Sequence, residues 1–171
     1  MKTILPRANR GILLVMTLFI VAWNSNSCNS QTKVLKFDTL HQSDFSLEYE
    51  DEVPGVMVFI SASDAKLKEA FFQESAREKL RNNNFDDYLV IAVFSGWSGT
   101  GHEGINIEKI LNQENEIFIF VSIGGPTGKD TESSPYQLIR IRNFTSNKHL
   151  MTFNLVSDNA IVATSTLEIS D

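Results

Sequence analysis

The chain has 171 residues, of which 42% are hydrophobic and 10% aromatic, a composition that predicts a globular domain with an apolar core. The first 27 residues hold three basic residues and no acid, which leaves 12 Lys and Arg against 21 Asp and Glu, or −9, in the remainder. This charge argues against a nucleic-acid partner, which requires a basic face. A single Cys excludes an internal disulfide framework and a multi-Cys zinc site.

Residues 1–27 have the order of a secretory signal peptide. Residues 1–10 are basic, residues 11–23 form an apolar run interrupted only by Thr17, and residues 24–27 are polar. A helix of this run rises about 20 Å, whereas the hydrocarbon of a bilayer is about 30 Å thick. We therefore predict cleavage after Ser27 and export; the alternative is an uncleaved amino-terminal anchor.

The predicted cut lies immediately before Cys28, the only thiol of the chain. Ser25 and Ser27 place small residues at the −3 and −1 positions. Cys28 is then either a terminal thiol of a secreted protein or a lipid-attachment cysteine that holds the protein at a membrane. Residues 28–33 are predicted to be a polar tether and residues 34–171 a single globular domain.

Three segments of the domain are almost continuously apolar: residues 56–60, 88–94 and 117–123. They are short, rich in β-branched and aromatic residues, and bounded by Gly and Pro, so we predict strands buried on both faces. Phe120 lies in the third segment and should be buried whichever way it points. Phe120→Ala is therefore expected to be among the costliest single substitutions.

One packed helix is predicted near residues 64–80, with Ser61 or Ser63 as its N-cap. Its apolar stripe comprises Leu67, Ala70, Phe71, Ala76 and Leu80. This helix would cover one face of the sheet.

The remaining segments alternate in polarity, as half-exposed strands do. The first places Ile105, Ile107, Lys109 and Leu111 on one side, the second opposes Ile139 and Ile141 to Arg140 and Arg142, and the third contains Met151, Phe153 and Leu155. Hairpin turns are predicted at residues 112–116 and 157–159. The fold class is α+β, mainly antiparallel β as a sheet or sandwich, with one packed helix.

No pattern in the chain indicates catalysis, so we predict no enzyme, no cofactor and no metal site. His102 and Glu103 are adjacent and would point to opposite faces of a strand, and the glycines around them lead into a strand rather than a helix. The acidic run 48–52 lacks the spacing of a calcium loop and is predicted to be a solvated turn.

Residues 85–142 carry four features in a fixed order. These are an apolar strand after Phe85-Asp86, a glycine-rich loop at 100–104 that runs into 105–110, Pro126 with Gly128, and the strand Pro135-Tyr136-Gln137-Leu138-Ile139-Arg140-Ile141. This order resembles the C-terminal domain of the PrcB-type protease-complex proteins, with a matching core at about residues 56–142. The resemblance implies an exported, non-catalytic domain that binds or stabilises a protease or another envelope protein.

The resemblance implies, by position, that partner contacts lie in two loops, residues 97–104 and 126–135. The candidate residues are Trp97, Thr100, His102, Glu103, Pro126, Thr127 and Lys129. Because the strands at 105–111 and 117–123 form a hairpin, both loops should attach at the end of the sheet opposite its turn. Trp97 either faces the partner or folds onto the core.

Two other functions stay open at this point. An envelope protein of this kind could bind a glycan or small ligand, with Trp97 stacking on a sugar face. A hydrolase would require His102 to meet a nucleophile and an acid in space.

Overall fold

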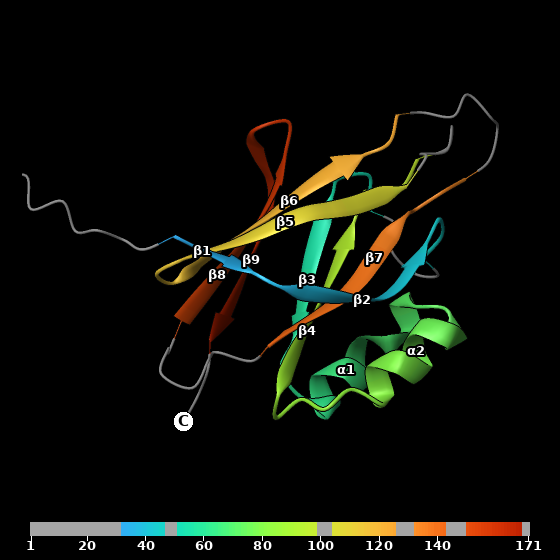
Figure 1. Cartoon of the computed structure of the whole chain (residues 1–171). Helices are drawn as coiled ribbons and strands as arrows, with labels where there is room; N and C mark the ends of the chain where they lie inside the picture. The colour runs from blue at the N-terminus through green and yellow to red at the C-terminus, as the bar shows by residue number, and fades with distance from the viewer. Residues whose placement is uncertain (1–31, 47–50, 99–103, 126–131, 143–149, 169–171) are drawn as a thin grey trace, which may run out of the picture.

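The computed structural model describes residues 32–46, 51–98, 104–125, 132–142 and 150–168, which form two β-sheets and a layer of short helices (Figure 1). The strands are β1 (Lys33–Leu35), β2 (Phe37–Ser43), β3 (Gly55–Phe59), β4 (Tyr88–Phe94), β5 (Ile105–Gln113), β6 (Glu116–Ile123), β7 (Tyr136–Arg142), β8 (Leu150–Ser157) and β9 (Ala160–Glu168). The helices are α1 (Ala62–Lys68), the 3-10 helix η1 (Glu69–Phe71) and α2 (Glu74–Arg81).

The strands are divided between two sheets. Sheet A has the order β1-β5-β6-β8-β9 and sheet B the order β2-β7-β4-β3. Neighbouring strands are antiparallel in every pair but β6 and β8. The predicted fold class, α+β with mainly antiparallel strands, is therefore confirmed, and the sandwich is the alternative that the chain adopts.

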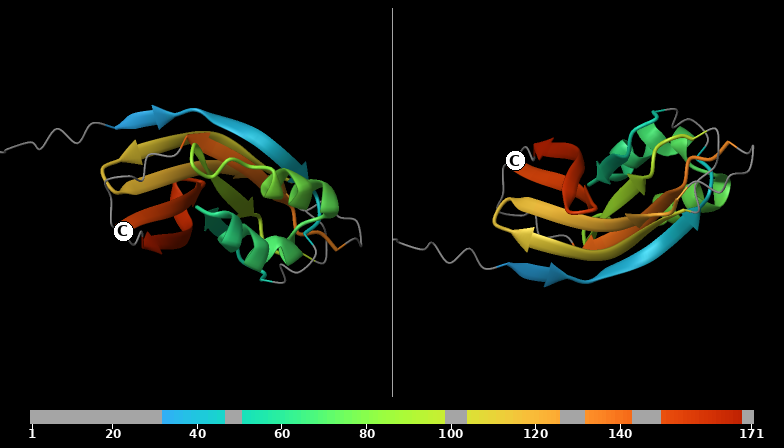
Figure 2. Two further views of the ribbon diagram at one scale, coloured as in Figure 1. Left: turned by 90° about the horizontal axis from the view of Figure 1, so that it is seen from below. Right: turned by 90° about the horizontal axis from the view of Figure 1, so that it is seen from above.

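Two apolar cores hold the layers together, because sheet B is covered on both faces. The first core lies between the sheets and includes Ile91, Ile119 and Phe153. The second lies between sheet B and the helices and includes Val90 and Phe72. In Figure 2 the helices lie beside sheet B and away from sheet A. Strand β4 contributes to both cores, which confirms that residues 88–94 are buried on both faces.

Strand β6 differs from its prediction, because only one of its faces is covered. Ile117, Ile119 and Val121 are buried, whereas Phe118 and Phe120 are half-buried. The outer face of sheet A carries no helix among the described residues. The Lys109 ammonium lies 4.3 Å from the centre of the Phe120 ring, a contact that needs an accessible ring face. Phe120 is therefore not a core residue, and Phe120→Ala is no longer expected to be among the costliest substitutions.

The predicted helix is broken into two. Ser61 caps α1, since its hydroxyl accepts a hydrogen bond from the Asp64 N–H at 3.1 Å, and this confirms one of the two predicted caps. After α1 the chain tightens into η1 and resumes as α2, which changes the phase of the stripe. Of the predicted stripe, Ala76 and Leu80 of α2 are fully buried as expected, Ala70 and Phe71 are half-buried, and Leu67 of α1 is 82% exposed. Phe72, which the stripe did not include, is fully buried.

Both predicted hairpins are present and are tighter than expected. Glu114 adopts a positive φ of 57° between β5 and β6, and Asp158 and Asn159 adopt 50° and 62° between β8 and β9. Asp and Asn tolerate this region better than most residues. A register shift between Ile107 and Lys109 puts Ile110 in the core. Lys109 and Leu111 therefore do not share the side of Ile105 and Ile107 that the alternation predicted.

The two amino-terminal strands were not predicted, since β1 begins inside the predicted tether of residues 28–33 and β2 follows it. The strand predicted around Met151, Phe153 and Leu155 is β8, and β9 follows the turn, so this pair lies at one side of sheet A as the hairpin pattern indicated. Among the described residues, no helix has the length and apolar character needed to span a membrane.

Candidate functional site

One end of the sandwich brings together the described residues on either side of the segments 47–50, 99–103 and 126–131, and these three segments lie outside the described residues (Figure 1). We call it the loop end and define it by the described residues 43–46, 51–53, 95–98, 104–105, 123–125 and 132–136. These segments lie at the last residues of β2, β4 and β6 or at the first residues of β3, β5 and β7. Because neighbouring strands here are antiparallel, these strand ends lie at one end of the sandwich.

Backbone hydrogen bonds join the roots of these connections to one another. They run from Ser46 N to Ser134 O (3.0 Å), Ser134 N to Asp44 O (3.2 Å), Ser98 N to Ser133 O (2.9 Å), Ser133 N to Ser98 O (3.0 Å), Gly124 N to Gly104 O (2.9 Å) and Trp97 N to Asp51 O (2.7 Å). The two predicted contact loops therefore leave the same end of the sandwich, which confirms that expectation. The acidic segment around residues 44–53 joins them there.

Buried polar side chains form hydrogen bonds directly beneath the loop end. The Ser46 and Ser134 hydroxyls share a buried hydrogen bond of 2.9 Å. Gln137 of sheet B accepts a hydrogen bond from the Ile107 N–H of sheet A at 2.7 Å, and its amide donates to Thr39 Oγ1 at 3.1 Å. Buried polar groups require such partners. The bond between Ile107 and Gln137 joins the two sheets beneath the loops, and the other two hold sheet B and its flanking residues in place.

Gly96 allows the acidic segment to lie against the end of β4. Its φ is +92°, and a Cβ at this position would lie 2.6 Å from the carbonyl oxygen of Glu52. Real Cβ atoms do not approach a backbone oxygen so closely, so only glycine fits here. The close approach places Asp51 and Glu52 next to Trp97.

Trp97 is the one predicted contact residue that falls within the described residues. Trp97 is half-buried, so part of its surface is accessible at the loop end. The other predicted contact residues, Thr100, His102, Glu103, Pro126, Thr127 and Lys129, lie outside the described residues, as does Cys28.

The loop end is acidic. Asp44, Asp51, Glu52 and Glu132 are exposed there. In sequence, residues 44–52, 96–104 and 124–135 together contain eight Asp and Glu residues and one Lys. Reasoning from the sequence assigned the run 48–52 to a solvated turn and did not connect it to the two loops. The signal for that contact was Gly96, which lies two residues after the end of the buried strand β4. A glycine in such a position often marks a close approach of another backbone segment.

Two titratable side chains of sheet B, His41 and Tyr136, have pKa values shifted by burial. His41 packs against Tyr136 with ring centres 5.7 Å apart. Burial, and then the Lys79 ammonium, lowers the pKa of His41, while burial raises the pKa of the Tyr136 phenol. No group of three or more His, Cys, Asp or Glu side chains within the described ranges could hold a metal ion.

A comparison of the chain with protein-family models, with curated proteins and with solved structures finds no match.

Proposed function

We propose that the protein is an exported, non-catalytic interaction module of the cell envelope whose loop end binds a protease or another envelope protein. The observation that carries this proposal is the set of backbone hydrogen bonds that joins the roots of three neighbouring connections. Binding residues are often carried by loops on a rigid scaffold. Fixed roots also reduce the conformational entropy lost on association.

The charge of the loop end favours a partner with a basic face. Asp44, Asp51, Glu52 and Glu132 are exposed, and the described ion pairs involve none of them. Complementary charge increases the rate of association and disfavours wrong partners. We therefore expect the partner to present Lys and Arg, and binding to weaken as salt rises.

Removing loop-end charge should weaken partner binding. In D44N/E52Q two exposed acids become neutral, and we expect a several-fold loss of affinity at low salt because each exposed charge contributes about 0.2–1 kcal/mol. Crosslinking in native envelopes followed by mass spectrometry would identify the partner. The affinity of the purified pair would then be measured for each variant.

The matched control is E78Q/E108Q, which removes the same charge from exposed positions on α2 and β5. It should bind as the unchanged protein does. Equal loss in both variants would assign the effect to net charge and contradict a site at the loop end. If no protein crosslinks and a glycan panel instead shows binding that Trp97→Ala abolishes, the glycan-binding alternative replaces the proposal.

The cell-envelope part of the proposal depends on Cys28. If this cysteine carries the lipid, Cys28→Ser should move the protein from the membrane fraction to the soluble fraction, because acyl chains would supply the anchor. Fractionation after a high-salt wash measures this, and the intact mass of the mature protein reports both cleavage after Ser27 and acylation. Unchanged membrane retention with no added mass would exclude a lipid at Cys28.

A further inference from the structure

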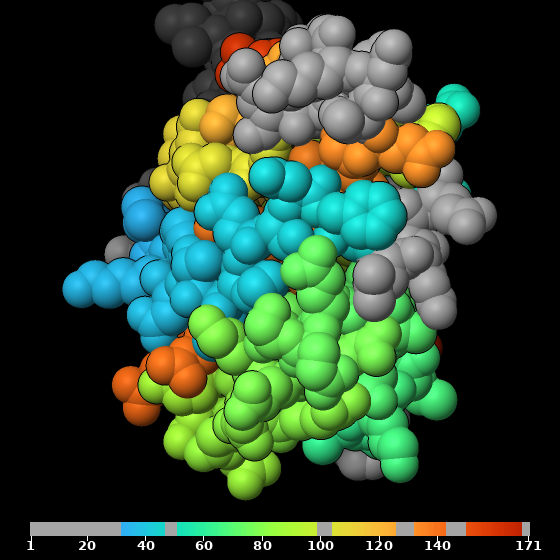
Figure 3. Space-filling view, turned by 90° about the vertical axis from the view of Figure 1, so that its right-hand side faces the viewer, coloured from blue at the N-terminus to red at the C-terminus, as the bar shows by residue number. Residues whose placement is uncertain are grey.

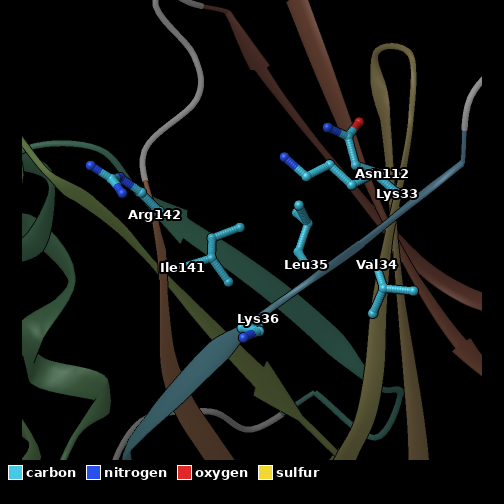
Figure 4. Close-up of a pocket in the computed structure, with 7 residues that line it drawn as sticks. All are labelled: Lys33, Val34, Leu35, Lys36, Asn112, Ile141 and Arg142. Carbon is cyan, nitrogen blue, oxygen red and sulfur yellow. The ribbon is translucent and has the colours of Figure 1, made fainter.

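A pocket of about 350 Å³ opens between the two sheets at the end opposite the loop end (Figure 4). It is lined by Lys33, Val34, Leu35, Lys36, Asn112, Ile141 and Arg142. The pocket forms where the chain crosses from β1 of sheet A to β2 of sheet B, since Lys36 is the residue between these strands. Its volume is at the lower end of the range for small-molecule sites.

The interior of the pocket is apolar. Leu35 of β1 and Ile141 of β7 point into the same space from different sheets (Figure 4). Both side chains belong to the sandwich core or pack against it. A hydrocarbon group placed between them would remove apolar surface from water, at about 25 cal/mol per Å².

The rim of the pocket is cationic. Lys33, Lys36 and Arg142 are exposed, and the ion pairs of the described residues include none of them. In Figure 4 the Asn112 amide nitrogen is turned to the side of the pocket on which the Lys33 ammonium lies. All four groups can donate hydrogen bonds to an anion. Three cations that lie outside the described ion pairs thus surround one pocket, in a chain whose formal charge is −6.

We propose that this pocket binds an anionic amphiphile, with its head group held by Lys33, Lys36 and Arg142 and its hydrocarbon chain against Leu35 and Ile141. This inference does not depend on the function proposed for the loop end. A membrane lipid and a free amphiphile share this chemistry. Lys33 lies five residues after Cys28, within about 17 Å for an extended chain, so a lipid anchor there would keep the pocket near a bilayer surface.

Binding is tested on the protein with Cys28→Ser, so that no attached lipid occupies the pocket. The probes are decyl phosphate, decyl maltoside as the uncharged amphiphile, and inorganic phosphate as the head group alone. Calorimetry gives the affinity, and amide chemical shifts locate the site. We expect decyl phosphate to bind at least tenfold more tightly than either of the other two, with shifts at residues 33–36, 112 and 141–142.

The deciding variant is K36Q/R142Q, which should weaken decyl phosphate binding about tenfold. Its control, K66Q/K68Q, removes the same charge from exposed positions of α1 and should leave binding unchanged. The proposal is overturned if no probe binds, if decyl maltoside or phosphate binds as tightly as decyl phosphate, or if the two variants behave alike.

Vesicles then identify the source of the ligand. Sedimentation with phosphatidylglycerol-containing vesicles, but not with pure phosphatidylcholine, and its loss in K36Q/R142Q would support a membrane lipid. Binding of soluble decyl phosphate without vesicle binding would support a free amphiphile.

Discussion

Phe72→Ala is expected to lower the free energy of unfolding by about 3–5 kcal/mol, the range for truncation of a buried Phe. Phe72 is fully buried between the helices and sheet B. Its ring centre lies 6.0 Å from that of Phe59, 5.9 Å from that of Phe94 and 5.3 Å from that of Tyr136. In the part of the chain that the structure describes, Phe72 is the residue of the helical layer that contacts three other aromatic rings. Its removal leaves a cavity at the point where this layer attaches to the sheet.

Urea unfolding followed by circular dichroism measures this loss. Leu67→Ala is the control, because Leu67 lies on the neighbouring helix α1 and is 82% exposed. Its effect should stay within about 0.5 kcal/mol, as for most surface substitutions. Similar losses in the two variants would show that Phe72 does not join the layers.

The space-filling view in Figure 3 shows the face where α2 packs beside β2.

Gly96→Ala is expected to lower the free energy of unfolding by about 2–5 kcal/mol. The positive φ of +92° disfavours any residue with a Cβ, by about 1–2 kcal/mol. The new methyl group would also meet the backbone of Glu52 at 2.6 Å and that of Val53 at 3.0 Å. Relief of such overpacking costs about a further 1–3 kcal/mol. Because the Glu52 segment would have to move, the variant should also lose the proposed partner binding.

Gly125→Ala is the control for stability, since no atom of the described residues lies within 4 Å of a Cβ built at that position. Thermal unfolding compares the stability of the two variants, and the affinity of Gly96→Ala for the partner is compared with that of the unchanged protein. If Gly96→Ala were as stable as Gly125→Ala, the close approach of residues 51–53 to β4 would be wrong. Retained partner binding in a destabilised Gly96→Ala would separate the packing role of this glycine from the function.

The fold was predictable where the pattern is local. Turn residues such as Asp158 and Asn159 and a continuous apolar run such as 88–94 fix a hairpin or a central strand by themselves. The partial exposure of Phe120 was not predictable from the sequence. An apolar strand is covered on both faces only if another layer packs on its second face. The helices pack on sheet B, and their phase depends on the tight turn η1, which no propensity signals.

The candidate site was predictable in part for the same reason. The hairpin of β5 and β6 places residues 104 and 124 together by local geometry, so two loops could be assigned to one end. The pairing of Ser46 with Ser134 joins residues 88 positions apart, and no local pattern reports it. The pocket between the sheets also depends on how β1 and β7 face each other, which alternation along one strand does not reveal.

The parallel pairing of β6 with β8 makes the sandwich core depend on the hairpin of β8 and β9. Glu116 pairs with Thr152, 36 positions later in the chain, and such non-local pairing forms slowly. Until β8 and β9 dock, β6 is an unprotected sheet edge, and the sandwich core lacks Met151, Phe153 and Leu155. An open edge beside an incomplete core is the usual starting point for strand pairing between molecules. A chain in which the hairpin of β8 and β9 is not docked would therefore expose both the edge of β6 and part of the core to pairing with other molecules.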